Sequence, residues 1–402
     1  MYELISASTQ GFNHIKRGNP CEDYGKVFES ELCRIFTVAD GHGDSNCPRS
    51  SFGSKTACEI AISEMANFCS GINESRWDSK ILAGGKDLDA LARQLISSIV
   101  VKWGKAVNEE FAANPLSEEE RLECKRYIER YDRGERLEHI YGTTLIAGLM
   151  TEKYLLLLQQ GDGRCVVFHS DGSVSQPIPW DDKCFANVTT SLCDEDAIQR
   201  FRYCVVNLDE NPIIACLAGS DGVEDSFFSM DLMHSYYREL LIYASESGVA
   251  ELNAHLLETL PEFSQKGSGD DVTICGVVDK EKVAALVPAF QRDNKIVSKE
   301  SEIRAIDDRL KSMNGMGKMS ALKARYDSAL AEVSDAEEAK RKLESSLIQL
   351  KESAEQANDC LLKAQEKLDA AEREYKEFTD RKDAYEKEKA EAEQQLAVLR
   401  NS

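Results

Sequence analysis

The sequence predicts an α+β domain with a sheet-on-sheet core, followed by a long coiled-coil helix. Short apolar runs come in consecutive groups rather than in strict alternation with helical patterns, which favours packed sheets over a doubly wound fold. Near residue 300 the composition changes from a globular mixture to Ala, Glu, Lys and Leu without proline. A heptad repeat then runs through residues 321–402.

Before residue 300, short apolar runs are predicted to be strands and longer stretches with a helical period are predicted to be helices. The predicted strands are Leu4–Ser8, Cys33–Ala39, Thr143–Met150, Lys153–Gln159, Cys165–His169, Ile213–Ala218 and Val272–Val278. The predicted helices are Ser50–Phe68, Leu88–Phe111, Ser117–Tyr131, Ser229–Ala244 and Val249–Leu260. Ser117 and Glu120 form a capping box at the start of the third of these helices.

The C-terminal repeat predicts a coiled coil. Between Leu322 and Leu399 the seam positions lie alternately four and three residues apart. Such a helix spans about 115 Å at ~1.5 Å per residue, and it needs a partner helix to bury its seam. The partner is a second copy of the chain or another protein, and a lone solvated helix is the remaining alternative. Gly315 and Gly317 weaken the helix before the repeat, so we expect a globular domain at 1–290, a linker or hinge at 291–320 and a coiled coil at 321–402.

The formal net charge of -22 argues against some classes of partner. Phosphate backbones and anionic membranes attract basic surfaces, so we expect neither nucleic acid nor membrane as a partner. No apolar run reaches the ~18 residues that a membrane span needs. The 13 cysteines are odd in number, lack zinc-like spacing and follow no apolar targeting segment. This pattern indicates free thiols in a cytoplasmic protein.

Acidic residues recur beside glycine where the predicted strands begin or end. Four motifs of this kind are Asp40-Gly41-His42-Gly43, Gly161-Asp162-Gly163, Ser220-Asp221-Gly222 and Gly269-Asp270-Asp271, and a fifth acidic motif, Glu22-Asp23, lies just before Val27. One Asp-Gly pair is usually only a turn. If the strand ends converge, however, several carboxylates share a small volume and must bind cations or take up protons. Oxygen ligands without paired His or Cys favour Mg²⁺ or Mn²⁺ over Zn²⁺.

In their order along the chain, together with Gly142-Thr143-Thr144, the motifs resemble those of metal-dependent serine/threonine protein phosphatases of the type 2C family. The run Gly11-Phe12-Asn13-His14 resembles a bacterial branch of that family. The resemblance covers residues 11–278. It implies two packed antiparallel β-sheets flanked by helices, an α/β/β/α sandwich, with a metal cluster at one edge. Residues 1–290 would then be the catalytic domain.

The resemblance also implies a set of metal ligands, which are acidic side chains and one backbone carbonyl. They are Asp40, Asp221 and Asp270 at one ion, Asp40, Glu22 and the Gly41 carbonyl at a second, and Asp162, Asp225 and Asp221 at a third, looser ion. The expected cofactors are therefore two or three Mg²⁺ or Mn²⁺ ions per chain.

Other residues receive catalytic or phosphate-binding roles from the same resemblance. Asp23 would orient the metal-bound water, and His42 would act as general acid for the leaving Ser or Thr oxygen. The family commonly has a phosphate-binding Arg where this chain has Gly18. Arg17 or His14 would take its place.

The leading hypothesis is dephosphorylation of phosphoserine and phosphothreonine proteins by metal-activated water. The coiled coil would serve dimerisation or partner recruitment. Two alternatives stay open: a phosphatase fold that has lost turnover and acts as a sensor or scaffold, and a phosphatase of a small phosphorylated metabolite.

Overall fold

The computed structural model describes residues 1–71, 76–124, 127–184, 188–311, 323, 325–335 and 338. The chain forms two compact units, Met1–Val287 and Pro288–Ser402. The first unit contains the sheets and the acidic motifs, and the second contains the segment with the heptad repeat.

Two five-stranded sheets form the first unit, and every neighbouring pair of strands is antiparallel. In spatial order, the first sheet contains β1 (Glu3–Thr9), β10 (Val272–Val278), β9 (Ile213–Gly219), β6 (Arg164–His169) and β7 (Val174–Ser175). The second contains β2 (Tyr24–Glu29), β3 (Arg34–Ala39), β4 (Leu145–Met150), β5 (Tyr154–Gln160) and β8 (Arg202–Asn207). This arrangement confirms the predicted sheet-on-sheet fold.

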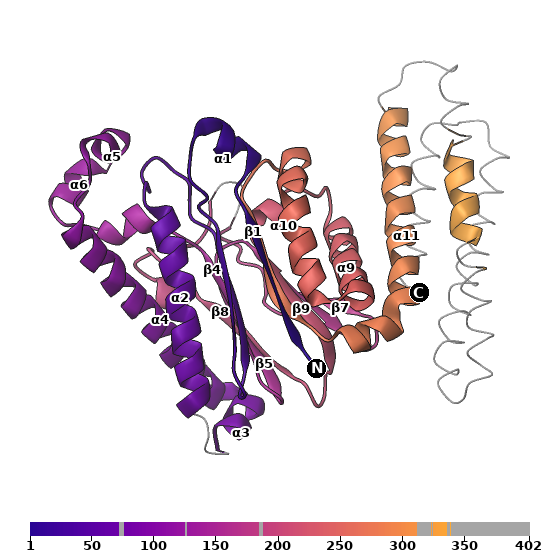
Figure 1. Cartoon of the computed structure of the whole chain (residues 1–402), viewed down its shortest axis with the longest axis horizontal. Coiled ribbons are helices and arrows are strands. Elements are labelled where there is room, and N and C mark those ends of the chain that lie inside the picture. The colour runs from indigo at the N-terminus through magenta and orange to yellow at the C-terminus, as the bar shows by residue number, and fades with distance from the viewer. Residues whose placement is uncertain are drawn as a thin grey trace. The chain divides into compact units, whose positions relative to one another are not determined.

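Helices flank the two sheets (Figure 1). The longer ones are α2 (Ser50–Gly71), α4 (Gly85–Ala113), α9 (Met230–Ser247) and α10 (Val249–Lys266). A further long helix, α11 (Lys280–Lys311), begins at the end of the first unit and continues into the second. The shorter ones are α1 (Phe12–Arg17), α3 (Arg76–Ala83), α5 (Glu118–Glu123), α6 (Ile128–Asp132), the 3₁₀ helix η1 (Leu137–Tyr141), α7 (Ala197–Arg200) and α8 (Asp221–Glu224). Helix α2 packs on β2 and β3 with α4 beside it, while α10 packs on β1 with α9 beside it.

Alternate residues of each central strand enter different layers of the core, as the period of two in a strand requires. On β3, Ile35 and Ala39 join the cluster beneath α2 and α4. Phe36 and Val38 point the other way, into the cluster between the two sheets. Both layers are therefore mainly apolar, and the acidic motifs lie at the strand ends.

The sequence predicted most of these elements. All seven predicted strands are present, and the capping box of Ser117 and Glu120 is confirmed at the start of α5. The predicted helix Ser117–Tyr131 is wrong as a single element, because α5 ends before Cys124 and α6 begins at Ile128. The elements that were not predicted from the sequence are β2, β7, β8 and the helices α1, α7, α8 and α11.

The second unit contains the start of the heptad repeat. Residues 325–335 are helical, and the seam residues Ala329 and Val333 are buried. Glu332 pairs with Lys299 of α11 at 2.5 Å, so this segment contacts α11 of its own chain. Residues 339–402, most of the predicted coiled coil, lie outside the described residues.

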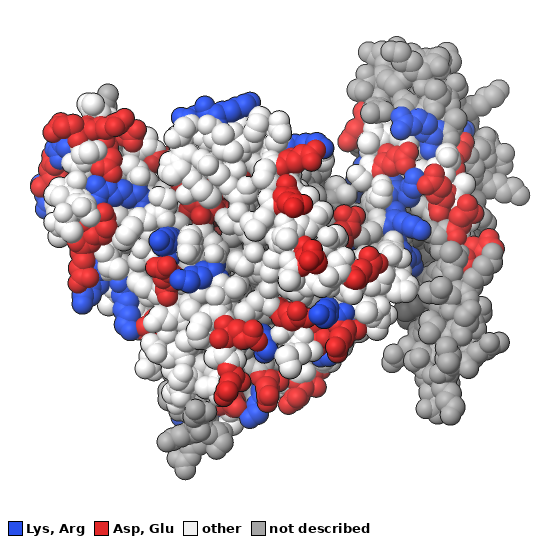
Figure 2. Space-filling model, viewed as in Figure 1, with Lys and Arg blue, Asp and Glu red and all other residues white. Residues whose placement is uncertain are grey.

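Surface charges and cysteines agree with the composition. On the face shown in Figure 2, basic side chains of the described residues lie among acidic ones rather than in one continuous patch. The cysteines within the described ranges are free thiols, most of them buried. In the described part of the chain, no helix combines the length and apolar character needed to cross a membrane.

Candidate metal centre

Strand pairing in the second sheet brings the first two acidic motifs together. Tyr24 of β2 pairs with Ala39 of β3, so the residues just before β2 lie beside those just after β3. The Gly41 N–H donates to the Glu22 carbonyl at 3.1 Å and closes this pair of loops. Glu22, Asp23 and Asp40 therefore lie at the same end of the second sheet.

The corresponding end of the first sheet carries two more acidic motifs, Ser220-Asp221-Gly222 and Gly269-Asp270-Asp271. Gly219 at the end of β9 pairs with Ile274 of β10, and the Ser220 N–H donates to the Thr273 carbonyl at 3.1 Å. Asp221, the first residue of α8, therefore follows β9 at the edge where the Asp270-Asp271 pair precedes β10.

A hydroxyl group links the two sheets at this edge. The Ser220 hydroxyl donates to Asp23 Oδ2 at 2.7 Å and accepts the Thr273 N–H at 3.1 Å. The Asp23 carboxyl is thus buried and fixed in direction, and burial raises its pKa well above the usual range. The strand ends of the two sheets therefore meet in one polar site.

The Gly-Thr-Thr motif holds the backbone of Asp40. The Asp40 N–H donates to the Thr144 hydroxyl at 3.0 Å, while its carbonyl accepts the Thr143 hydroxyl at 2.9 Å and the Thr144 N–H at 2.8 Å. Both threonines are buried. Their role is therefore to fix the position of Asp40 rather than to react.

Burial and mutual repulsion raise the pKa values of the clustered carboxyls. Burial raises the pKa of Asp40 well above its usual range, and the charges of Asp221 and Asp23 raise it further. Burial raises the pKa of Asp221 to about 6, and the charges of Asp162 and Asp270 add to that rise. The structure therefore brings these predicted acids within electrostatic reach of one another.

The charges of the same acidic cluster also act on Asp225. Burial raises its pKa, and the charges of Glu224, Asp162 and Asp270 contribute in that order. Arg164 lies close by, but its Nη2 donates to Glu224 Oε1 at 2.6 Å and its Nε to Oε2 of the same residue. The guanidinium is therefore occupied by Glu224.

Glu22 is buried, and only one of its two carboxylate oxygens accepts a hydrogen bond from the described residues. The Ser50 hydroxyl donates to Oε1 at 2.9 Å, and within the described structure Oε2 has no hydrogen-bond partner. The side chain is 9% exposed, and burial raises its pKa. A buried oxygen of this kind is costly unless a ligand contacts it.

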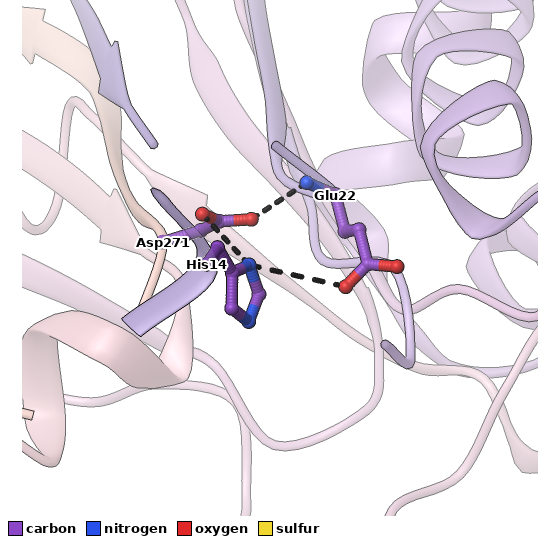
Figure 3. Close-up of side chains that lie close together, drawn as sticks. All are labelled: His14, Glu22 and Asp271. Atoms are coloured by element: carbon purple, nitrogen blue, oxygen red, sulfur yellow. Dashed lines mark hydrogen bonds and ion pairs between the residues drawn. The ribbon is translucent and has the colours of Figure 1, made fainter. Parts of the chain in front are cut away.

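His14 of α1 lies beside Glu22 and Asp271 (Figure 3). Its Nδ1 is 3.1 Å from Asp271 Oδ1 and 3.9 Å from Glu22 Oε2, and its Nε2 is 3.4 Å from Asp270 Oδ1. The ligand atoms of His14, Glu22 and Asp271 are close enough together to hold a metal ion.

Asp271 is the site residue that the sequence analysis missed. Its Oδ1 accepts the Gly11 N–H at 2.5 Å, and its Oδ2 accepts the N–H groups of Glu22 at 2.6 Å and Asp23 at 3.4 Å. The carboxylate thus joins the loop before α1 to the loop before β2. The Asp-Asp pair was visible in the sequence, but spacing alone does not say which member faces inward.

Two glycines allow the backbone to close around the Asp270-Asp271 pair. A Cβ at Gly11 would lie 2.4 Å from the Asp270 carbonyl carbon, and one at Gly222 would lie 2.0 Å from the Asp271 carbonyl oxygen. Real side chains do not tolerate such distances, so both positions require glycine.

Two of the predicted basic residues, His42 and Arg17, are not part of the cluster of buried carboxyls. The His42 N–H donates to the Gly142 carbonyl at 3.1 Å, and its ring lies against Gly142. Burial lowers the pKa of His42 to about 4, and the charge of His139 adds to that effect. Arg17 is the last residue of α1 and is exposed.

The donor set fits a divalent cation. Buried carboxyls with raised pKa values crowd one end of the sheets, and Glu22 Oε2 has no hydrogen-bond partner among the described residues. Oxygen-rich sites of this kind suit Mg²⁺ or Mn²⁺.

Comparison with known families identifies the fold. The family model described as protein phosphatase 2C matches residues 10–261, more than half of the chain. The chain belongs to the protein phosphatase 2C family. The matched range contains every predicted site residue except Asp270. No curated protein matches the chain in sequence.

Similar solved structures are bacterial phosphatases. A bacterial serine phosphatase is 16% identical with a TM-score of 0.42, and the match covers 69% of this chain and 98% of that one. Stp1 from Staphylococcus aureus is 16% identical with a TM-score of 0.41, covering 69% and 94%. The catalytic domain of PstP, solved with 2 manganese ions, is 17% identical with a TM-score of 0.41, covering 69% and 97%.

Proposed function

We propose that this protein phosphatase 2C family member removes phosphate from phosphoserine and phosphothreonine in proteins, using Mg²⁺ or Mn²⁺. The observation that carries the proposal is the convergence of acidic strand ends from both sheets at one edge, with the pKa values of Asp40 and Asp221 raised by burial and by neighbouring acids. Such a site needs cations to stay ionised at neutral pH.

The predicted ligands divide between the two sheets. Asp40, Glu22 and the Gly41 carbonyl would come from the second sheet, and Asp221 and Asp270 from the first. The third, looser ion would be held by Asp162, Asp225 and Asp221, whose charges act on one another. When bound, divalent cations make water nucleophilic near neutral pH and offset the charge of the phosphoryl group.

The chain's own residues orient and protonate the reactants in this proposal. Asp23, fixed by the Ser220 hydroxyl, orients the attacking water. His42 protonates the leaving Ser or Thr oxygen. Because the pKa of His42 is about 4 without substrate, this role requires the dianionic phosphate to raise it. Arg17, exposed at the end of α1, is the proposed phosphate-binding cation.

Turnover by the purified full chain tests the proposal. With Mn²⁺ it should hydrolyse p-nitrophenyl phosphate and a phosphothreonine peptide, and both EDTA and Asp40→Asn should abolish the reaction. Asp209→Asn, at an exposed turn between β8 and β9, is the matched control and should keep full activity. No turnover of either substrate by a chain shown to bind Mn²⁺ would favour the scaffold alternative. Activity on the aryl phosphate alone would favour the metabolite alternative.

For the heptad segment we propose dimerisation or recruitment of a partner helix. The ion pair between Lys299 and Glu332 favours a further possibility for its first turns, which is packing against α11 of the same chain. Light scattering of the full chain should give a dimer mass for self-association. A monomer mass would refute self-association and leave the intrachain partner or another protein.

A further inference from the structure

We propose that His14 is a metal ligand: with Glu22 and Asp271 it forms a nitrogen-containing position that favours Mn²⁺ over Mg²⁺. The proposal rests on the metal dependence proposed above. It differs from the phosphate-binding role that the sequence suggested for His14, and it adds Asp271 to the ligand set.

The ligand atoms of the three residues lie within 4.8 Å of one another, and the distances from His14 Nδ1 to the other two suit one shared cation. Ligands at about 2.1 Å from an octahedral ion lie about 3.0 Å apart when adjacent and about 4.2 Å apart when opposite. His14 Nδ1 lies 3.1 Å from Asp271 Oδ1 and 3.9 Å from Glu22 Oε2, between those limits. The close-up in Figure 3 shows the three side chains converging from α1, the loop before β2 and the loop before β10.

Two of the three ligand atoms lack hydrogen bonds within the described structure. They are His14 Nδ1 and Glu22 Oε2, each buried at the atom. The Glu22 side chain is more than nine-tenths buried, so solvent does not satisfy Oε2. A cation between these atoms would satisfy both at once, whereas a phosphate placed there would meet carboxylates of its own charge.

Each ligand also has a polar neighbour on the side that faces away from the ion, as metal ligands usually do. The Ser50 hydroxyl fixes the other oxygen of Glu22 at 2.9 Å, and the Glu22 N–H fixes the other oxygen of Asp271 at 2.6 Å. With Nδ1 toward the ion, Nε2–H of His14 faces Asp270 Oδ1 at 3.4 Å. A carboxylate behind the imidazole is the common arrangement for a ligating histidine, and it selects the tautomer with Nδ1 free.

The short helix that carries His14 is anchored on both sides. The Asn13 N–H donates to the Gly269 carbonyl at 2.8 Å, and the N–H of Gly18, in the left-handed conformation, caps the carbonyls of His14 and Ile15. The imidazole is therefore positioned by backbone contacts rather than by a flexible loop.

A nitrogen ligand changes which ion the site prefers. Mg²⁺ favours oxygen ligands, while imidazole raises affinity for Mn²⁺ and later transition metals. We expect His14→Gln to weaken Mn²⁺ binding at this position by about tenfold and to change Mg²⁺ binding by less than about twofold.

Pulsed EPR of the full chain loaded with Mn²⁺ provides the test, because an imidazole nitrogen bound to Mn²⁺ gives a ¹⁴N coupling. The wild type and the control variant His255→Gln, on α10, should show this coupling, and His14→Gln should lose it. Calorimetric titrations with Mn²⁺ and with Mg²⁺ give the affinity ratio of each protein.

Two outcomes overturn the proposal. One is a wild-type Mn²⁺ complex without ¹⁴N coupling, which needs no variant to fold. The other is a ¹⁴N coupling or an unchanged Mn²⁺ to Mg²⁺ affinity ratio in His14→Gln. Phosphatase assays on the same samples separate this proposal from the proposed function. Turnover without ¹⁴N coupling refutes only the role of His14, and ¹⁴N coupling without turnover refutes only the proposed function.

Discussion

Replacing Glu120 by Gln tests the ion-pair network that holds α5. Arg49 Nε donates to Glu120 Oε1 at 2.7 Å and Nη2 donates to Oε2 at 3.0 Å, while Nη1 donates to Glu110 Oε2 at 3.0 Å. The Arg49 side chain is only 13% exposed. The hydrogen bonds from Arg49 to Glu120, together with those from Ser117, lower the pKa of Glu120 from 4.5 to about 2, against the effect of burial.

The size of the effect follows from that pKa. One pKa unit corresponds to about 1.4 kcal/mol, so the unscreened interactions of the Glu120 carboxylate with Arg49 and Ser117 contribute about 3 kcal/mol at neutral pH. Solvent reaches part of Glu120, and screening reduces the expected loss of unfolding free energy in Glu120→Gln to about 2 kcal/mol. The capping box survives this change, because Gln caps from the same position as Glu. The substitution therefore isolates the charge.

The sign of the pH dependence follows from the depressed pKa. The stabilisation is complete above pH 4.5, the ordinary value, and is lost as the pH falls toward about 2. Urea unfolding, followed by fluorescence including that of buried Trp103, should show a difference of about 2 kcal/mol at pH 7. At pH 3 the difference should shrink to less than half of its value at pH 7, since Glu120 is by then protonated in the unfolded chain.

The matched control is Glu118→Gln, at an exposed position in the first turn of the same helix. It should change the unfolding free energy by less than about 0.5 kcal/mol. An equal difference between wild type and Glu120→Gln at both pH values would refute the reasoning, as would an equal loss in the control.

Two further predictions concern the metal centre. Gly222→Ala should lower the unfolding free energy by about 3 kcal/mol because its Cβ would meet the Asp271 carbonyl oxygen at 2.0 Å. Gly104→Ala, on a helix where a Cβ meets nothing within 4 Å, should instead stabilise by about 1 kcal/mol, and thermal unfolding of both variants distinguishes these signs. Ser220→Ala removes the hydroxyl that orients Asp23, so kcat should fall severalfold with little change in KM; a rise in KM at constant kcat would contradict this positioning role.

The sequence predicted the fold well where strands are fully buried. Strands such as β5 and β9 are buried along their whole length and contain long apolar runs, which gives a strong signal. β2 and β8 were not predicted, because they are the two edge strands of the second sheet and are only half-buried. Edge strands carry polar residues, here Lys26 and Arg202, that weaken the apolar pattern.

The acidic cluster was predictable because strand pairing alone brings the motif-bearing ends together. Its details were not. Asp270 and Asp271 are adjacent, and only the structure shows that the side chain of Asp271 is 3% exposed while that of Asp270 is 50% exposed. The sequence also could not place His14, because the direction of its ring depends on how α1 is anchored to Gly269.

The break between α5 and α6 also required tertiary information. The pattern from Ser117 to Tyr131 suits one helix, but the Cys124 side chain is buried and the Tyr131 hydroxyl donates to the Asn46 carbonyl at 3.0 Å. Each of these residues makes a tertiary contact, and the two helices, α5 and α6, are separate elements. Local propensity cannot report such contacts.

The Asp271 carboxylate has a consequence for how the centre acquires its ion. Because it already joins Gly11, Glu22 and Asp23 through their N–H groups, the loops around the site are ordered during folding. A cation that arrives later meets a preorganised group of ligands and loses little affinity to the entropy of ordering loops. Metal exchange should then leave the backbone nearly unchanged, and hydrogen exchange at these three amides should be slow with or without the ion.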